Sequence, residues 1–215
     1  LPLISAKDHK KIGDGETGLN TGGMGVIAPN PYVTDLVQQQ FMQEILAPTL
    51  AGIQAEQMDF AGVIFFGVMI TQNGIYLLEY NMRLGDPETQ AVLPLLESDL
   101  LTLFEASIEK RLDQVELSWH PGATCCVVLA SGGYPEEYVN NLPIHGVKEF
   151  NQTDCQLFTA GIALQEQQFV TAGGRVLNIV AKGNTPLDAR NKAYAAIQEI
   201  QFKDCYCRND IGNIN

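Results

Sequence analysis

The hydrophobic and polar positions in the first third of the chain predict a long helix. Thr34 is suited to the N-cap position, where its side-chain oxygen can accept a backbone hydrogen bond. Val37, Phe41 and Ile45 follow at helical spacing, so their apolar stripe is expected to face a core. Pro48 lacks the amide hydrogen that a helix interior uses, and is therefore expected to kink this helix or divide it.

A β-hairpin is predicted next. Residues 60–71 form a nearly continuous apolar run, Asn73-Gly74 is typical of a tight turn, and residues 75–80 run back. Because the first strand is apolar along its length, we expect both faces of the hairpin to be buried. A glutamate ionised on the return strand would then need a cation beside it.

The rest of the chain predicts two helices followed by a mostly β segment. The chain is expected to turn helical after Pro87, and Ser98 is expected to cap the next helix. The buried side of that helix is expected to hold Leu101, Phe104 and Ile108. Strands are then predicted over 123–130, 144–150, 155–164, 168–172 and 176–181, with a packing helix that Thr185 caps.

A domain boundary is predicted in residues 111–121, which mix charge, an aromatic residue and a proline. We therefore expect one domain over 1–112 and a second, β-rich domain with one helix over 120–215. The fold class that follows is α+β.

Composition and charge restrict the classes of function. Of the 215 residues, 46% are hydrophobic and 18% are charged, as in an ordinary folded protein. The formal charge of −12 repels polyanions, and the basic cluster Lys7, Lys10 and Lys11 is small, so we expect no nucleic acid partner. Since the chain shows neither a signal peptide nor an apolar run long enough for a membrane, a cytoplasmic location is the expectation. The five cysteines lack the spacing of a zinc site and are expected to be reduced thiols.

Glycine is concentrated in the segment GDGETGLNTGGMGVIAPNP, which begins at Gly13 and ends at Pro31. Glycine lets the backbone take positive φ and approach a ligand, so amide groups here can cradle an anion. The segment lacks the Gly-Lys-Ser/Thr ending of a P-loop and the glycine pattern of a dinucleotide fold. A flexible surface loop remains the alternative.

The strongest candidate for chemistry is the end of the return strand, which reads YLLEYNMRLGDPE. Glu79 and Asn81 lie on one face of an extended strand, and Arg83 follows. A carboxylate and an amide oxygen are hard ligands suited to Mg²⁺, which completes its shell with phosphate and water, and a guanidinium holds phosphate oxygens. The alternative is a solvated strand end in which Arg83 pairs with Asp86 or Glu88, and spacing alone does not decide between the two.

Five stretches, in this order and spacing, resemble the phosphoribosylamine-glycine ligase (glycinamide ribonucleotide synthetase) family: DHKKIGDGETGLNTGGMG, FAGVIFFGVMIT, LLEYNMRLGDPETQ, LASGGYP and TAGGRVL. The resemblance covers essentially the whole chain. It implies the C-terminal half of an ATP-grasp fold, followed by a small mostly β domain with a packing helix. It also implies an enzyme that uses ATP to join glycine to 5-phosphoribosylamine through glycyl phosphate, in purine biosynthesis.

The resemblance also implies roles for individual residues. Glu79 and Asn81 stand where the family binds Mg²⁺ or Mn²⁺ beside ATP, and Arg83 stands where it stabilises the transferred phosphate. Asp86 and Glu88 are implied to orient that arginine or to bind the amine. Further substrate- or phosphate-binding residues implied by the family are Asp8, His9, Lys10, Asn20, Thr21, Gly22, Gly23 and Met24.

Further expectations concern the rest of the protein, the alternatives to this assignment, and two residues in the C-terminal part of the chain. The chain begins with Leu, inside an apparent strand, so the N-terminal domains of the same protein are expected upstream, and the chain alone is expected to bind MgATP weakly and to lack ligase activity. The alternatives are another ATP-grasp ligase and a non-catalytic ATP-grasp remnant or interaction module. His145 and Arg175 are either substrate-facing, or a hydrogen-bonded histidine and a salt-bridged arginine.

Overall fold

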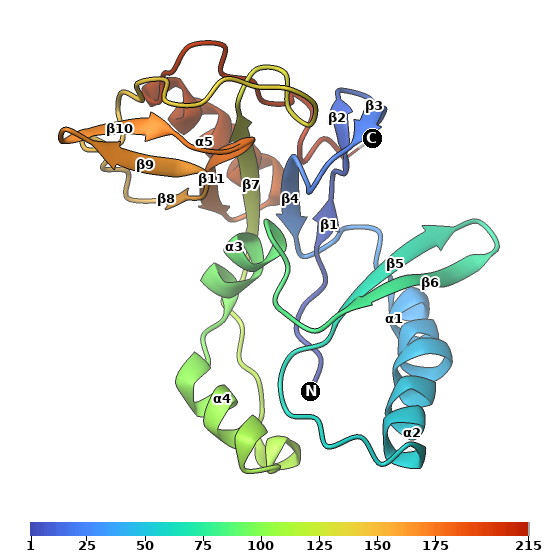
Figure 1. The fold of residues 1–215 in the computed structure, drawn as a ribbon. Coiled ribbons are helices and arrows are strands. Elements are labelled where there is room, and N and C mark those ends of the chain that lie inside the picture. Colours follow the sequence, from blue (N-terminus) through green and yellow to red (C-terminus); the bar gives the residue numbers. More distant parts are fainter. Residues whose placement is uncertain (215) are drawn as a thin grey trace. The chain divides into compact units, whose positions relative to one another are not determined.

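The computed structural model describes residues 1–214, and the chain forms two compact units that alternate along the sequence (Figure 1). The first unit holds Leu1–Leu3, Asn30–Gly85 and Ser98–Ser118, and the second holds Ile4–Pro29, Asp86–Glu97 and Trp119–Asn215. These units differ from the predicted ranges 1–112 and 120–215, because residues 4–29 and 86–97 pack with the C-terminal part of the chain.

A long helical segment opens the first unit. It consists of α1 (Asp35–Gln40), a π-helical segment (Phe41–Leu46) and α2 (Ala47–Ala55). Thr34 caps it as predicted, since its hydroxyl accepts a hydrogen bond from the amide of Val37 at 3.3 Å.

Pro48 changes the type of this helix without ending it. The turns before the proline widen, so that the amide of Ala47 bonds to the carbonyl of Met42, five residues earlier. A π-helical turn is one of the usual ways in which a helix accommodates such a disruption.

The predicted hairpin is present as β5 (Phe65–Thr71) and β6 (Gly74–Asn81), which pair antiparallel. The expectation that both of its faces are buried is wrong. Tyr76, Leu78 and Tyr80 of β6 are exposed, because in the described chain these two strands pair only with each other. The helical segment contacts the hairpin through the rings of Phe41 and Phe66, whose centroids lie 5.3 Å apart.

The helix predicted after Ser98 is α4 (Leu100–Ile108), and two details of its prediction are wrong. Its N-cap is Asp99, whose carboxylate accepts from the amide of Thr102 at 2.7 Å. Its buried face also differs from the predicted one, because the helix is apolar on most sides and packing selects which side is buried. The buried residues are Leu103 and Ala106, whereas Leu101, Phe104 and Ile108 are exposed.

An antiparallel five-stranded sheet in the order β1-β4-β7-β11-β8 organises the second unit. Every residue of β7 is buried, because both faces of this strand are covered. The hydroxyl of Thr124 donates to the carbonyl of Ala91 in α3, while Cys125 packs in the core with α5, which lies against β7 and β11 (Figure 1). The elements of the sheet and its helices are β1 (Lys7–Asp8), β4 (Gly25–Ala28), β7 (Ala123–Ala130), β8 (Cys155–Thr159), β11 (Arg175–Gly183), α3 (Glu88–Val92) and α5 (Pro186–Ala196).

Two further hairpins flank this sheet, β2 (Lys11–Gly13) with β3 (Thr17–Asn20), and β9 (Ile162–Gln165) with β10 (Gln168–Thr171). The strand predicted over 155–164 is thus divided into β8 and β9. The strand predicted over 144–150 is wrong, since this segment makes a single isolated bridge, between His145 and Gln201.

The helix cap predicted from the sequence of this unit is present. The hydroxyl of Thr185 accepts from the amide of Asp188 at 3.1 Å and caps α5 as predicted. In the described chain the five cysteines are free, and burial raises the pKa of the Cys125 thiol to about 12. Across residues 1–214, every helix is too short or too polar to cross a lipid bilayer.

Candidate functional site

Glu79 and Asn81 lie on the same face of β6, at the end of the strand. The pairing register places Gly67 of β5 opposite Glu79, and Phe65 opposite Asn81. A Cβ at position 67 would lie 2.8 Å from Cγ of Glu79, so the glycine provides the space that this side chain uses. Glu79 is exposed, and its carboxylate is therefore available to a ligand.

Arg83 lies beside this pair. Its guanidinium donates to the amide oxygen of Asn81 at 3.4 Å and to the carbonyl of Leu84 at 3.1 Å. Asp86 and Glu88 have partners within the second unit, since Asp86 bonds to Arg175 and Gln90, and Glu88 lies near Lys10. One strand end therefore gathers a carboxylate, an amide oxygen and a guanidinium.

The donors of this strand end fit a hard divalent cation that shares its shell with another ligand. Within residues 1–214 no group of three or more His, Cys, Asp or Glu side chains could hold a metal ion. Glu79 and Asn81 supply two oxygen donors, and Mg²⁺ commonly takes only one or two protein ligands while phosphate and water fill the rest. The residues present thus suit a metal that arrives with a nucleotide.

A second cluster, in the second unit, brings together Asp8, Lys10 and Glu88. The ammonium of Lys10 pairs with the Asp8 carboxylate and lies 3.8 Å from Oε1 of Glu88. Both carboxylates are largely buried; burial and then repulsion by Glu88 raise the pKa of Asp8 to about 6, although Lys10 lowers it. Two carboxylates with one ammonium carry a net negative charge, which suits a cationic amine better than a phosphate.

His9 is buried and points into the interior. Its Nδ1 lies 3.2 Å from the carbonyl oxygen of Gly25, and burial lowers the pKa of the imidazole to about 4. The ring is therefore neutral at physiological pH. Its implied role at the site stays a prediction.

The glycine-rich loop of residues 20–24 lies along this cluster. The amide of Thr21 donates to the carbonyl of Lys10, and the amide of Met24 donates to that of His9, both at 2.8 Å. Gly23 has φ +118°, and a Cβ there would lie 2.7 Å from Oδ1 of Asp8. The loop can approach Asp8 this closely only because position 23 is glycine.

Two further residues contact this loop: Tyr134, which the sequence analysis did not single out, and Arg175, for which it left two alternatives. Tyr134 accepts a hydrogen bond from the amide of Gly22, and Arg175 donates to the carbonyl of Gly22 and forms an ion pair with Asp86. The salt-bridged alternative for Arg175 is thus confirmed. Both residues lie in motifs that the sequence made visible, LASGGYP and TAGGRVL.

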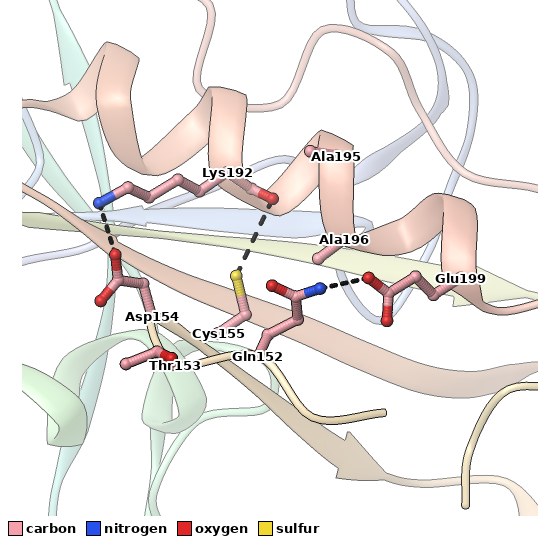
Figure 2. Close-up of a pocket in the computed structure, with 8 residues that line it drawn as sticks. All are labelled: Gln152, Thr153, Asp154, Cys155, Lys192, Ala195, Ala196 and Glu199. Atoms are coloured by element: carbon pink, nitrogen blue, oxygen red, sulfur yellow. Dashed lines mark hydrogen bonds and ion pairs between the residues drawn. The ribbon is translucent and has the colours of Figure 1, made fainter. Parts of the chain in front are cut away.

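A separate surface hollow of about 250 Å³ lies between the start of β8 and α5 (Figure 2). Its polar side chains bond to one another, since Lys192 lies 3.0 Å from Asp154 and Gln152 donates to Glu199. Burial raises the pKa of the Cys155 thiol, which disfavours the reactive thiolate. We therefore interpret this hollow as a structural feature of the packing between β8 and α5. Its lining is Gln152, Thr153, Asp154, Cys155, Lys192, Ala195, Ala196 and Glu199.

Two domain models of one family match the chain. The ATP-grasp (A) domain of phosphoribosylglycinamide synthetase matches residues 1–89, and the C domain of the same enzyme matches residues 124–214. The chain is 52% identical over 216 residues to the phosphoribosylamine–glycine ligase of Fusobacterium nucleatum, covering 100% of this chain and 51% of that protein. The corresponding enzyme of Escherichia coli is 43% identical over 214 residues, covering 99% and 50%. The chain thus spans about half the length of the curated relatives it matches.

Solved structures agree with this similarity. The crystal structure of phosphoribosylamine–glycine ligase from Thermotoga maritima superposes with a TM-score of 0.85 at 31% identity, over 97% of this chain and 51% of that one. The biotin carboxylase domain of a thermophilic 2-oxoglutarate carboxylase gives a TM-score of 0.60 at 12% identity, over 85% and 41%, which is a likeness of fold alone. The predicted α+β class and ATP-grasp fold are confirmed.

Proposed function

Because the chain belongs to the phosphoribosylglycinamide synthetase family, we propose that it is part of a ligase that uses ATP to join glycine to 5-phosphoribosylamine. The product would be glycinamide ribonucleotide, an intermediate of purine biosynthesis. The observation that carries the proposal is the grouping of Glu79, Asn81 and Arg83 at one strand end.

Glu79 and Asn81 are the residues that would hold Mg²⁺ or Mn²⁺. When bound, the cation neutralises charge on the phosphates of ATP. Arg83 carries a fixed positive charge beside Asn81, where it can bind phosphate oxygens and stabilise charge during phosphoryl transfer. A non-catalytic module would not need Glu79, Asn81 and Arg83 together at this strand end.

The cluster of Asp8, Lys10 and Glu88 is proposed to bind the amine side of the reaction. Its two carboxylates attract an ammonium group, and Asp8, with its raised pKa, can accept a proton near neutral pH. The loop of residues 20–24 borders the same cluster and contributes backbone groups. In this mechanism the glycine carboxylate attacks the γ-phosphate of ATP, which releases ADP and gives glycyl phosphate. The amine of 5-phosphoribosylamine then attacks the acyl carbon, which releases phosphate and a proton, so no covalent enzyme intermediate is required.

The remaining partners follow from the length of the relatives. The nucleotide and both substrates are proposed to bind a protein that includes the N-terminal domains of the relatives, in the cytoplasm. The chain alone should bind MgATP weakly and should not form glycinamide ribonucleotide.

The test is Glu79→Gln in the full-length protein, with Glu116→Gln as an exposed control in the same unit. Glu79→Gln should abolish Mg²⁺-dependent formation of glycinamide ribonucleotide and leave thermal unfolding unchanged, whereas Glu116→Gln should behave as wild type. Retained turnover in Glu79→Gln would refute the ligand assignment, and robust ligase activity of the isolated chain would refute its dependence on the other domains.

A further inference from the structure

The backbone of Gly22 is held at both its amide and its carbonyl by side chains that are distant in sequence. Its amide donates to the hydroxyl of Tyr134 at 2.9 Å, across a separation of 112 residues. Its carbonyl accepts from Nη1 of Arg175 at 2.8 Å, across a separation of 153 residues. All three residues belong to the second unit.

Arg175 also contacts the turn that precedes α3. Its Nη1 donates to the backbone carbonyl of Asp86 at 2.8 Å, and its Nη2 lies 3.3 Å from the Asp86 carboxylate. One guanidinium therefore joins the loop of residues 20–24 to the Asp86–Glu88 turn. A planar guanidinium presents several donors in a fixed fork, and a lysine ammonium cannot reproduce that geometry.

Glycines on both sides make these contacts possible. A Cβ at Gly22 would lie 2.9 Å from Cζ of Arg175, so only glycine lets the guanidinium approach the loop this closely. A Cβ at Gly174 would lie 2.2 Å from Cδ2 of Tyr134, so the residue next to Arg175 leaves space for the tyrosine ring. The ring of Tyr138 supports Tyr134 from another side, with centroids 6.3 Å apart.

We infer that Arg175 and Tyr134 are positioning residues, which hold the glycine-rich loop against the Asp86–Glu88 turn and so preform the amine side of the site. This inference rests on the proposed function. Neither residue needs to touch a reacting atom, because each acts through the backbone of Gly22. Preforming two binding segments avoids the loss of conformational freedom that substrate would otherwise impose on them.

The kinetic test uses the full-length protein with Arg175→Lys and Tyr134→Phe, and Tyr138→Phe as the matched control. The KM for phosphoribosylamine should rise about tenfold in Arg175→Lys, as expected for the loss of hydrogen bonds from a charged group, and less in Tyr134→Phe. The KM for MgATP should stay near wild type in both, since Glu79, Asn81 and Arg83 belong to the other unit. Tyr138→Phe keeps the ring and should match wild type throughout.

A second readout does not depend on ligase activity. Amide hydrogen exchange at Gly22 should be faster in Tyr134→Phe than in wild type or Tyr138→Phe, because its amide loses the tyrosine hydroxyl. Unchanged exchange at Gly22, or equal increases in the KM for MgATP and for phosphoribosylamine, would overturn the inference. Tyr134→Phe removes a single oxygen and provides the test if Arg175→Lys does not fold. A wild-type protein without ligase activity would instead refute the proposed function, while the exchange measurement would still test the role of Tyr134.

Discussion

Gly67 lies directly opposite Glu79 in the β5–β6 hairpin, and a Cβ on the glycine would lie 2.8 Å from Cγ of the glutamate. The position of the proposed metal-binding carboxylate thus depends on the absence of a side chain in the neighbouring strand. A binding group held on paired strands is oriented more precisely than one on a loop.

Gly67→Ala should displace Glu79 and lower the kcat/KM of the full-length ligase by about a hundredfold, because small misplacements at a reacting centre carry large costs. Gly52→Ala is the control, since that glycine lies in α2 with nothing within 4 Å of its added Cβ. The control should keep wild-type kinetics and gain about 0.5–1 kcal/mol in unfolding free energy. Steady-state kinetics and urea denaturation measure both effects. Equal kinetics in the two variants would show that Glu79 does not depend on Gly67.

Gly23→Ala should be more destabilising than Gly15→Ala, although both glycines have positive φ. A methyl group at position 23 would lie 2.6 Å from Cδ of Pro87 and 2.7 Å from Oδ1 of Asp8, whereas position 15 is open. Gly15→Ala should therefore cost about 1 kcal/mol from backbone strain alone, and Gly23→Ala about 1–3 kcal/mol more from the clash. Urea denaturation of the two variants compares these costs, and equal losses would contradict the crowding at Gly23.

Asp8→Asn should stabilise the protein in a pH-dependent manner. The folded pKa of Asp8, about 6, lies above its ordinary value of 3.8, so the folded state binds more protons in this interval. The contribution of Asp8 to stability therefore falls as pH rises from 4 to 6 and stays low above it. The advantage of the variant over wild type should grow over this range to at most about 3 kcal/mol. Unfolding free energies at several pH values measure it, and a difference independent of pH would contradict the buried position of Asp8.

Arg208→Met should destabilise the second unit by about 2–3 kcal/mol, because a fully buried guanidinium loses charge-assisted hydrogen bonds to partly exposed carboxylates. The side chain is fully buried and bonds to Glu16 at 2.9 Å, to Asp210 at 2.7 Å and to the carbonyl of Lys11 at 3.0 Å. Arg208 thereby links Lys11 and Glu16 of the β2–β3 hairpin to Asp210. Urea denaturation gives the loss, and a loss below about 1 kcal/mol, typical of a surface ion pair, would contradict this role.

Acidification should weaken the same network. The hydrogen bond from Arg208 holds the pKa of Asp210 well below its ordinary value. For a carboxylate with a depressed pKa, the stabilisation is present above the unfolded value of 3.8 and is lost as pH falls below it. Asp210→Asn should therefore be less stable than wild type at pH 7, and this difference should shrink towards pH 2. Denaturation midpoints at the two pH values test the expectation, and a constant difference would contradict it.

Sequence by itself determined the features that depend on neighbouring residues. Thr34 and Thr185 are predicted helix caps, and both are present, because each signal acts within a few residues. The tight turn predicted at Asn73-Gly74 lies one residue earlier, at Gln72-Asn73, since Gly74 already pairs with Thr71 as the first residue of β6. The grouping of Glu79, Asn81 and Arg83 was visible for the same reason, since alternation along one strand places the first two side chains together.

Tertiary structure alone decided which surfaces are buried and which distant segments meet. An apolar helix such as α4 has more than one face that could pack, and only its neighbours select Leu103 and Ala106. The contacts of Tyr134 and Arg175 with Gly22 join residues more than a hundred positions apart. Such contacts follow from how the sheet of the second unit brings its strands together, and local preferences along the chain carry no information about them.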